Sequence, residues 1–320
     1  MASNNEITLG RYSFRRKHAQ DESLWLYHVE TTISTMDEAK LLVESKFVDE
    51  KNDQCDSDNH TALDGTDMPK SFVISSTSQT NGRGTSKRKW ESAQTGNALF
   101  TVGIQQSAWM DDLKLRNYGK MVPLTLLPLK VGTVVASHVQ KFLLDCAKNK
   151  PIPRVTVKWP NDVLLYNDVI ASHEKVAGIL IESSQDWLLI GIGINVGYAP
   201  DIPSEGVDYG RNATALCKYC PRDELNKDQT WVDVATQLGR AIAFDLHSWL
   251  NHSSASFSTQ IGDNILTEWK SYVDWDMELV LRDTPNREKV TLKEVLDDGR
   301  AVVQETATGL KRTLVSDYFL

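Results

Sequence analysis

The spacing of apolar residues near the start of the chain predicts a strand followed by a helix. Residues 24–29 form a short apolar segment, and large apolar residues recur every three or four positions from Met36 to Phe47. Thr35 and Glu38 have the spacing of a capping box at the start of this helix.

Similar patterns extend through the middle of the chain. The long apolar segment 122–146 predicts a buried helix, and Pro128 predicts that this helix breaks or begins late. Residues 231–250 and 255–272 predict two more helices, each apolar on one side. Short apolar segments predict strands at 71–76, 99–105, 155–158, 163–166, 176–182 and 187–195. The brief connections between the last four favour antiparallel pairing.

The pattern changes after Trp275. Short β-branched segments alternate with turn residues such as Asp298-Gly299, which predicts a small barrel or sandwich of about 45 residues. Residues 49–70 are polar and predict a surface insertion. The expected organisation is a tail at 1–23, a large domain at 24–275 that contains this insertion, and a small β-domain at 276–320.

Composition narrows the class of protein. The 320 residues are 41% hydrophobic and 24% charged, as in ordinary globular proteins. The net charge of −8 argues against a general nucleic-acid binder. Basic residues nevertheless cluster at 83–89, which suits a small anionic ligand. No segment reaches the about 18 apolar residues of a membrane span, and the first twenty residues lack a secretory signal, so we expect no membrane association and a cytoplasmic location.

The cysteines indicate neither a disulfide framework nor a strong zinc site. The four cysteines include one C-x-x-C pair, Cys217 and Cys220, without a second pair. We therefore expect reduced cysteines in an intracellular compartment.

The first candidate site is the turn Gly82-Arg83-Gly84. Glycines let backbone amides approach a phosphate without a Cβ in the way. Arg83 and Arg88 can neutralise phosphate oxygens, and Trp90 offers a flat face for adenine or for core packing. The alternative is a basic surface loop with one buried tryptophan.

The second candidate site is the turn Lys158-Trp159-Pro160-Asn161-Asp162. Pro160 restricts the backbone, so an ammonium, an amide and a carboxylate are held in a defined geometry. Asn161 can bind a base or ribose edge, and Asp162 can orient or deprotonate an incoming amine. An ordinary turn between strands is the alternative.

Two glycine-containing strands complete the candidate chemistry. Lys175 begins an apolar segment in which Gly178 leaves space beside which a ligand could lie. Gly191 and Gly193 alternate in another apolar segment that ends at Asn195, and this pattern indicates close approach by a ligand or by neighbouring chain.

Ser34 and Thr35 stand at a predicted helix start. They are expected to cap that helix, and a helix N-terminus also attracts polar or anionic groups. Together these motifs predict an enzyme that uses a nucleotide.

The motifs, in this order, resemble those of the biotin protein ligase family. The matching segments are 34–39, 79–90, 158–162, 175–180 and 191–195. The resemblance implies an α+β fold with a central mixed β-sheet flanked by helices, as in class II synthetases and lipoate ligases, and a small C-terminal SH3-like barrel. It leaves no room before residue 24 for the DNA-binding winged helix of some members, so we expect no repressor role and no nucleic-acid partner.

The resemblance also implies a reaction in two steps. Biotin and ATP, with Mg²⁺, would form biotinyl-5'-adenylate and pyrophosphate. The biotinyl group would then pass to a lysine of a biotin carboxyl carrier domain of a biotin-dependent carboxylase, releasing AMP. We expect a monomer or a weak homodimer.

The resemblance assigns roles to individual residues. Arg83, Lys175 and Asp162 would be catalytic, and the magnesium ligands are not identified. Biotin would contact Ser34, Thr35, Gln79, Gly82, Arg83, Lys175, Gly178 and Gly191. ATP or the adenylate would contact Arg83, Arg88, Trp90, Lys158, Asn161, Asp162 and Asn195.

The chain departs from the family pattern at two places. Thr85 stands where members commonly carry a second arginine, and the stretch 167–173 is longer than in compact members. Two other functions stay open. A lipoate or octanoate ligase would need a longer apolar slot, and a non-catalytic module would bind a nucleotide or an acceptor without turnover.

Overall fold

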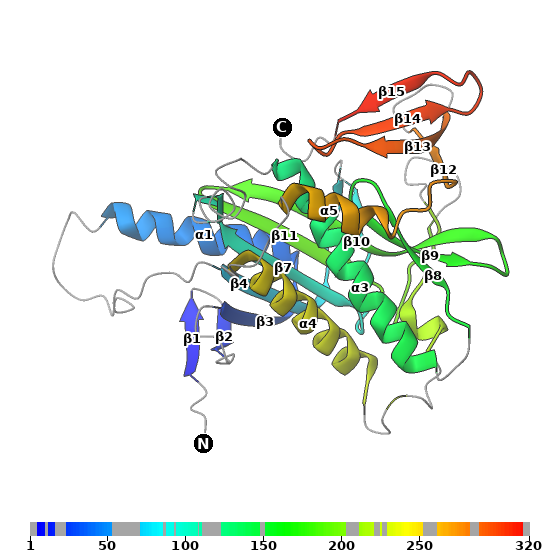
Figure 1. The fold of residues 1–320 in the computed structure, drawn as a ribbon. Helices are drawn as coiled ribbons and strands as arrows, with labels where there is room; N and C mark the ends of the chain where they lie inside the picture. Colours follow the sequence, from blue (N-terminus) through cyan, green and yellow to red (C-terminus); the bar gives the residue numbers. More distant parts are fainter. Residues whose placement is uncertain are drawn as a thin grey trace. The chain divides into compact units, whose positions relative to one another are not determined.

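The computed structural model describes an α+β protein, as predicted (Figure 1). It contains a seven-stranded mixed sheet flanked by helices and a four-stranded C-terminal sheet. The described residues are 5–9, 12–16, 24–52, 71–85, 88–92, 94–107, 109–110, 123–147, 151–202, 211–220, 225, 229–251, 261–281 and 288–315.

The large sheet combines parallel and antiparallel pairs. Strands β3 and β4 run parallel, whereas β4 with β7, β7 with β11, β10 with β9 and β9 with β8 run antiparallel. The predicted antiparallel pairing is therefore confirmed for β8, β9 and β10. In spatial order the strands are β3 (Leu24–Thr32), β4 (Ser71–Gln79), β7 (Ala98–Gln105), β11 (Trp187–Ile194), β10 (Ser172–Ser184), β9 (Asp162–Asn167) and β8 (Arg154–Lys158).

The chain divides into two compact units, and the division falls within β10. The first unit comprises Met1–Trp109, Leu180–Tyr198 and Thr230–Asn251. The second unit comprises Met110–Ile179, Ala199–Gln229 and His252–Leu320. The domain boundaries at 24–275 and 276–320 follow a different division and stay a prediction.

In the first unit two helices cover opposite faces of the sheet. Helix α1 (Thr35–Asn52) packs its buried Met36 and Val43 into a core with Phe72 of β4. His247 of helix α4 (Trp231–Asn251) forms a side-chain hydrogen bond with Ser71, the neighbour of Phe72 on β4. Because successive side chains of a strand point to opposite faces, α1 and α4 lie on different sides.

In the second unit α3 (Leu127–Ala147) is the main helix. It follows a 3₁₀ turn, η2 (Leu124–Leu126), so Pro128 lies in its first turn, and the predicted late start is confirmed. Lys130 of α3 pairs with Glu268 of α5 (Ile261–Lys270) at 2.6 Å. No helix within the described ranges is both long and apolar enough to cross a membrane.

The C-terminal segments form an antiparallel sheet in the order β12 (Glu278–Val280), β13 (Lys289–Val295), β14 (Ala301–Glu305) and β15 (Lys311–Leu314). Its turn Asp298-Gly299 contacts the rest of the second unit. The indole N–H of Trp159 donates to the carbonyl oxygen of Gly299 at 2.9 Å, and Thr125 Oγ1 donates to the carbonyl oxygen of Asp298 at 2.5 Å. Gly299 has φ +81°, a conformation that favours glycine.

Two short pairs lie outside these sheets. The predicted N-terminal tail contains an antiparallel pair, β1 (Asn5–Leu9) with β2 (Tyr12–Arg16). Another pair joins β5 (Gly82–Arg83) to β6 (Lys89–Trp90).

One predicted boundary differs from the structure, and another lies outside the described residues. Helix α1 runs to Asn52, so its last turn enters the stretch 49–70 that was expected to be a surface insertion. The polar character of residues 49–52 suggested a loop, but a helix can continue through polar residues. The rest of that stretch, and residues 255–260 of a predicted helix, lie outside the described residues.

One expectation about the cysteines is wrong. Cys146, near the end of α3, forms a disulfide with Cys220 across a sequence separation of 74 residues. Spacing along the chain could not show that these two segments meet. The state of the cysteines therefore no longer supports the expected intracellular location.

We predict that this disulfide stabilises the fold. Replacing Cys146 and Cys220 by serine should lower the free energy of unfolding by about 2 to 4 kcal/mol. Without the disulfide the unfolded chain is no longer restricted by a long covalent loop, so its conformational entropy rises. Urea unfolding of the oxidised protein measures this change, with Cys217→Ser as the control. Equal unfolding free energies for the double variant and the oxidised wild type would contradict the prediction.

Candidate active site

The structure gathers the predicted site residues into groups that lie within single units. The first unit holds the Gln79 cluster (Ser34, Thr35, Gln79, Ser92, Thr101) and the Arg83 network (Asp37, Lys40, Arg83, Glu182). The second unit holds the Asp162 cluster (Lys158, Asp162, Lys175, Arg211).

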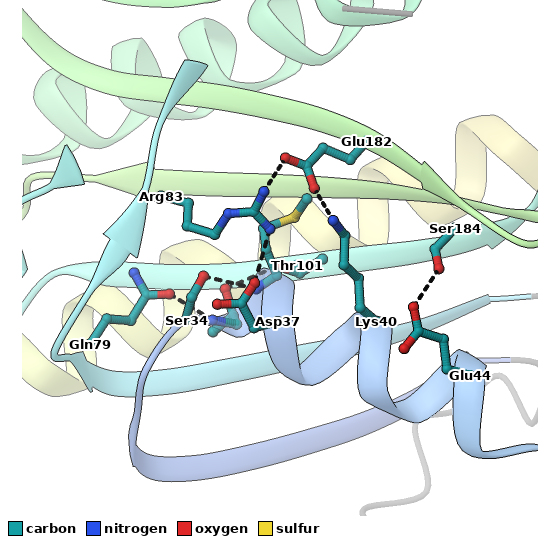
Figure 2. Close-up of polar contacts among 11 residues, drawn as sticks. Ser34, Asp37, Lys40, Glu44, Gln79, Arg83, Thr101, Glu182 and Ser184 are labelled. Carbon is teal, nitrogen blue, oxygen red and sulfur yellow. Dashed lines mark hydrogen bonds and ion pairs between the residues drawn. The ribbon is translucent and has the colours of Figure 1, made fainter. Parts of the chain in front are cut away.

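The Gln79 cluster is a buried set of polar groups at the start of α1 (Figure 2). Gln79 Oε1 accepts the backbone N–H of Thr35 at 2.7 Å, and its Nε2 donates to Ser92 Oγ at 3.3 Å. Thr101 Oγ1 donates to Thr35 Oγ1 at 2.9 Å. A buried polar group without a hydrogen-bond partner is costly, so these contacts stabilise the cluster.

The start of α1 differs from the predicted capping box. Ser34 is the N-cap: its Oγ accepts the N–H of Met36 at 3.3 Å, and its carbonyl oxygen accepts that of Glu38 at 3.1 Å. Glu38 accepts a hydrogen bond from Thr32 Oγ1 at 2.5 Å. The predicted pairing of Thr35 with Glu38 is wrong because Gln79, from a distant strand, binds the amide of Thr35.

The alternating glycines of β11 make room for side chains. A Cβ at Gly191 would lie 2.8 Å from Met36 Sδ, and one at Gly193 would lie 2.4 Å from the ring of Trp90. Both distances are shorter than van der Waals contact, so a larger residue would displace Met36 or the indole. The structure thus supports close packing as the reason for these glycines, and Trp90 packs against β11.

Arg83 contacts acidic side chains of the chain itself. Its Nη1 lies 2.9 Å from Asp37 Oδ1, and its Nη2 lies 2.6 Å from Glu182 Oε1. Lys40 Nζ lies 2.6 Å from the other oxygen of Glu182 (Figure 2). The guanidinium predicted to bind phosphate is thus held by two carboxylates, neither of which was predicted as a site residue.

Arg88 closes the loop that follows Arg83. Its Nε donates to the carbonyl oxygen of Thr85 at 3.1 Å, and its Nη2 donates to Thr85 Oγ1 at 2.5 Å. The carbonyl oxygen of Arg88 accepts the N–H of Gly84 at 2.8 Å. Lys87, within the basic cluster 83–89, lies outside the described residues.

Asn195 lies buried just after β11, where it accepts a hydrogen bond from Asn97 Nδ2 at 3.4 Å. Asn97 Oδ1 also accepts the N–H groups of Val196 and Tyr198. Sequence reasoning missed Asn97 because a lone asparagine before a strand carries no distinctive pattern. The pair shapes the turn where Asn195 was expected to meet the nucleotide.

The Asp162 cluster has one carboxylate between two ammonium groups. Lys175 Nζ lies 2.6 Å from Asp162 Oδ1, and Lys158 Nζ lies 3.1 Å from Asp162 Oδ2. Lys158 and Asp162 are register partners at the turn between β8 and β9, whereas Lys175 lies on β10. The structure therefore brings together the two lysines and the aspartate that two separate motifs had suggested.

Asn161 fastens the same turn to β10. Its Nδ2 donates to the carbonyl oxygen of Ile179 at 2.8 Å, and its own carbonyl oxygen accepts the N–H of Ile179 at 3.0 Å. The Trp159–Pro160 peptide bond is cis. Gly178, also predicted as a site residue, is the register partner of Asp162. The side-chain amide of Asn161, which was expected to bind a nucleotide base, therefore positions the turn.

The electrostatics of the cluster keep Asp162 ionised. Burial alone would raise the pKa of Asp162, but the ammonium groups of Lys175 and Lys158 outweigh it and hold the pKa well below its usual value. Burial lowers the pKa of Lys158, and Asp162 partly opposes this change. A carboxylate with so low a pKa has little affinity for a proton, which favours an orienting role for Asp162 over that of a general base.

Arg211 is a residue that sequence reasoning missed. Burial lowers its pKa, while the charge of Asp162 opposes the change, which makes it a third cation near one carboxylate. The segment after it supports Lys175: the N–H of Lys175 donates to the carbonyl oxygen of Asn212 at 2.7 Å, and the N–H of Thr214 donates to that of Lys175 at 2.9 Å. No spacing rule links this segment to Lys175.

The described residues offer no preformed magnesium site. Within them no three His, Cys, Asp or Glu side chains gather closely enough to hold a metal ion. Asp37, Asp162 and Glu182 each pair with cations. These residues therefore do not fit a protein-bound Mg²⁺.

Residues 46–198 match the Biotin/lipoate A/B protein ligase family. The chain is 30% identical over 140 residues to the biotin–[acetyl-CoA-carboxylase] ligase of Mycobacterium tuberculosis, a match that covers 44% of each chain. It is 28% identical over 149 residues to the bifunctional ligase/repressor BirA of Bacillus subtilis, covering 45% of this chain and 38% of that protein. The match thus spans less than half of either relative.

The fold is similar to solved biotin protein ligases over most of the chain. The Leishmania major enzyme in complex with biotinyl-5-AMP is 25% identical, with a TM-score of 0.53 over 91% of this chain and 98% of that one. The Aquifex aeolicus enzyme in complex with biotin and ATP is 22% identical, with a TM-score of 0.52 over 91% and 99%. The second likeness concerns the fold alone.

The pKa of Asp162 generates a prediction about acid stability. Because its folded-state pKa is lowered, the ionised carboxylate stabilises the fold above about pH 4 and loses that effect as the pH falls further. The difference in unfolding free energy between wild type and Asp162→Asn should therefore shrink from pH 6 to about pH 2, since a protonated aspartate resembles asparagine. Urea unfolding at each pH measures it, and a difference independent of pH would contradict it.

Proposed function

We propose that this chain, a member of the biotin/lipoate A/B protein ligase family, activates biotin with ATP and transfers it to a lysine of a biotin carboxyl carrier domain. The Asp162 cluster carries this proposal, because two lysines share one carboxylate at the Lys-Trp-Pro-Asn-Asp turn. Relatives with biotin ligase names support the choice of biotin.

The first step brings two anions together. An oxygen of the biotin carboxylate bonds to the α-phosphorus of ATP, and the bond from that phosphorus to the bridging oxygen breaks, releasing pyrophosphate. Repulsion between carboxylate and triphosphate must be offset by positive charge fixed in advance. Lys158, Lys175 and Arg211 supply three positive charges near the single negative charge of Asp162.

Asp162 orients these cations in the proposal. Each of its oxygens binds one lysine, so the two ammonium groups are fixed before the substrates arrive. Asn161 and the backbone of Asn212 hold the surrounding strands. Preorganisation of this kind lowers the barrier because little reorientation remains during reaction.

The Gln79 cluster fits the polar end of a largely apolar ligand. A biotin slot needs a few polar anchors within apolar walls. Buried Thr35 and Gln79 provide hydroxyl and amide groups next to Met36. We assign the biotin ring to this cluster.

The second step forms an amide. The neutral amine of the acceptor lysine attacks the acyl carbon of biotinyl-5'-adenylate. A C–N bond forms, the C–O bond to AMP breaks, and the proton of the amine passes to solvent. Because Asp162 has a low affinity for a proton, we assign it to orienting the amine or the neighbouring lysines in this step, not to deprotonating the amine.

One assay tests this function. The chain is incubated with labelled biotin, ATP and a carboxyl carrier domain, and parallel reactions contain lipoate or octanoate. Label on the carrier only with biotin is the expected result. Transfer of lipoate or octanoate instead would favour the other branch of the family, and no transfer of any acid would contradict catalysis.

Lys175→Ala should lower biotin-dependent pyrophosphate exchange by about 10²-fold or more, because a cation placed where charge develops is lost. Lys218→Ala is the matched control: Lys218 lies near Glu174, the neighbour of Lys175, at 3.9 Å and is mostly exposed. Exchange at the wild-type rate in Lys175→Ala, or an equal loss in Lys218→Ala, would contradict the assignment.

A further inference from the structure

The Arg83 network combines two positive and two negative side chains of the first unit. Arg83 and Lys40 carry the positive charges, and Asp37 and Glu182 carry the negative ones. These formal charges cancel. The network therefore presents no net positive charge to an anionic ligand, although Arg83 was predicted to bind one.

The contacts divide unequally between the two carboxylates. In the ion pairs of this network Asp37 contacts only Arg83. Glu182 binds Arg83 through one oxygen and Lys40 through the other. Figure 2 shows Arg83 and Lys40 approaching Glu182 from different elements. If Arg83 left, Glu182 would keep a cation at 2.6 Å.

The network borders the groups assigned to biotin. Asp37 and Lys40 are three residues apart on α1, so they share a face of the helix. Asp37 lies two residues after Thr35, whose amide binds Gln79. Arg83 follows Gly82 in β5. A substrate carboxylate or phosphate at the helix start would thus lie close to the guanidinium.

We propose that Glu182 and Asp37 act as an anion gate on Arg83, in which an anionic oxygen group of the substrate displaces Glu182 from the guanidinium while Lys40 retains it. The inference rests on the proposed function for the identity of that group, either the biotin carboxylate or a phosphate. Asp37 continues to orient Arg83 after the exchange. Lys40, Asp37 and Glu182 are then positioning residues.

The network is only partly buried. The side chains of Arg83 and Glu182 are 32% and 22% exposed. An ion pair that keeps some access to solvent contributes less net stability than a fully buried one, so another anion can replace Glu182 on the guanidinium. A fully buried pair would resist replacement, because a charge left without its partner is strongly destabilising.

Calorimetric titration of the full chain with inorganic pyrophosphate and, separately, with biotin tests the gate. Glu182→Gln removes one negative charge beside Arg83 and nearly preserves shape. It should tighten the Kd of the displacing anion by about 3- to 10-fold. Biotin methyl ester, which is neutral, should show no gain, and the anion that gains identifies the displacing group.

Glu44→Gln is the matched control, because Glu44 also lies on α1 and contacts β10, at Ser184, but not Arg83. It should leave both dissociation constants unchanged. Combining Glu182→Gln with Arg83→Met should abolish the gain, which assigns it to the guanidinium. Asp37→Asn provides a second variant and should tighten the same anion if Glu182→Gln does not fold.

Equal affinities in wild type and in the folded gate variant overturn the gate, including no measurable binding by either. An equal gain in affinity for Glu44→Gln would also overturn it, because the gain would then reflect the net charge of the protein and not the contact with Arg83. A failure of the proposed function would give a different result. Wild type would then show no biotin binding and no transfer, while the pyrophosphate titrations would still report whether Glu182 controls Arg83.

Discussion

The shared carboxylate of Asp162 is the interaction on which the account depends. Lys158 lies at the end of β8, Asp162 at the start of β9 and Lys175 on β10, so one partly buried ion cluster links three neighbouring strands. Two like charges held near each other need a counter-charge between them, and Asp162 supplies it. The ammonium groups of Lys175 and Lys158 lower its pKa. The same arrangement leaves more positive than negative charge around Asp162.

The two units contribute different kinds of polar group. In the first unit, hydroxyls and amides around Gln79 are buried and mutually hydrogen-bonded, and the charges around Arg83 cancel. In the second unit, positive charge exceeds negative charge around Asp162. The first environment is thus polar without net charge, and the second is positive. Strand β10 belongs to both units and carries both Lys175 and Glu182.

Much of the fold could be predicted because its determinants are local. Apolar spacing located β3, α1, β7 and α4 within a few residues, and Pro128 marked the late start of α3. Lys158, Asp162 and Lys175 of the Asp162 cluster were also predictable, since a proline-containing turn and a lysine-initiated strand have distinctive local sequences. Long-range partners were not predictable. Gln79 binds the amide of Thr35, Cys220 binds Cys146, and Glu182 binds Arg83, across separations that no local pattern reports. Arg211 and Asn97 lacked a motif for the same reason.

The most direct test of the central claim needs no acceptor. The chain would be mixed with biotin and ATP, denatured, and analysed by mass spectrometry for biotinyl-5'-adenylate and for pyrophosphate. The account predicts both products in equal amounts, formed only when biotin and ATP are present together. Hydrolysis of ATP without the adenylate, or no consumption of ATP at all, would contradict the assignment of these cations to adenylation.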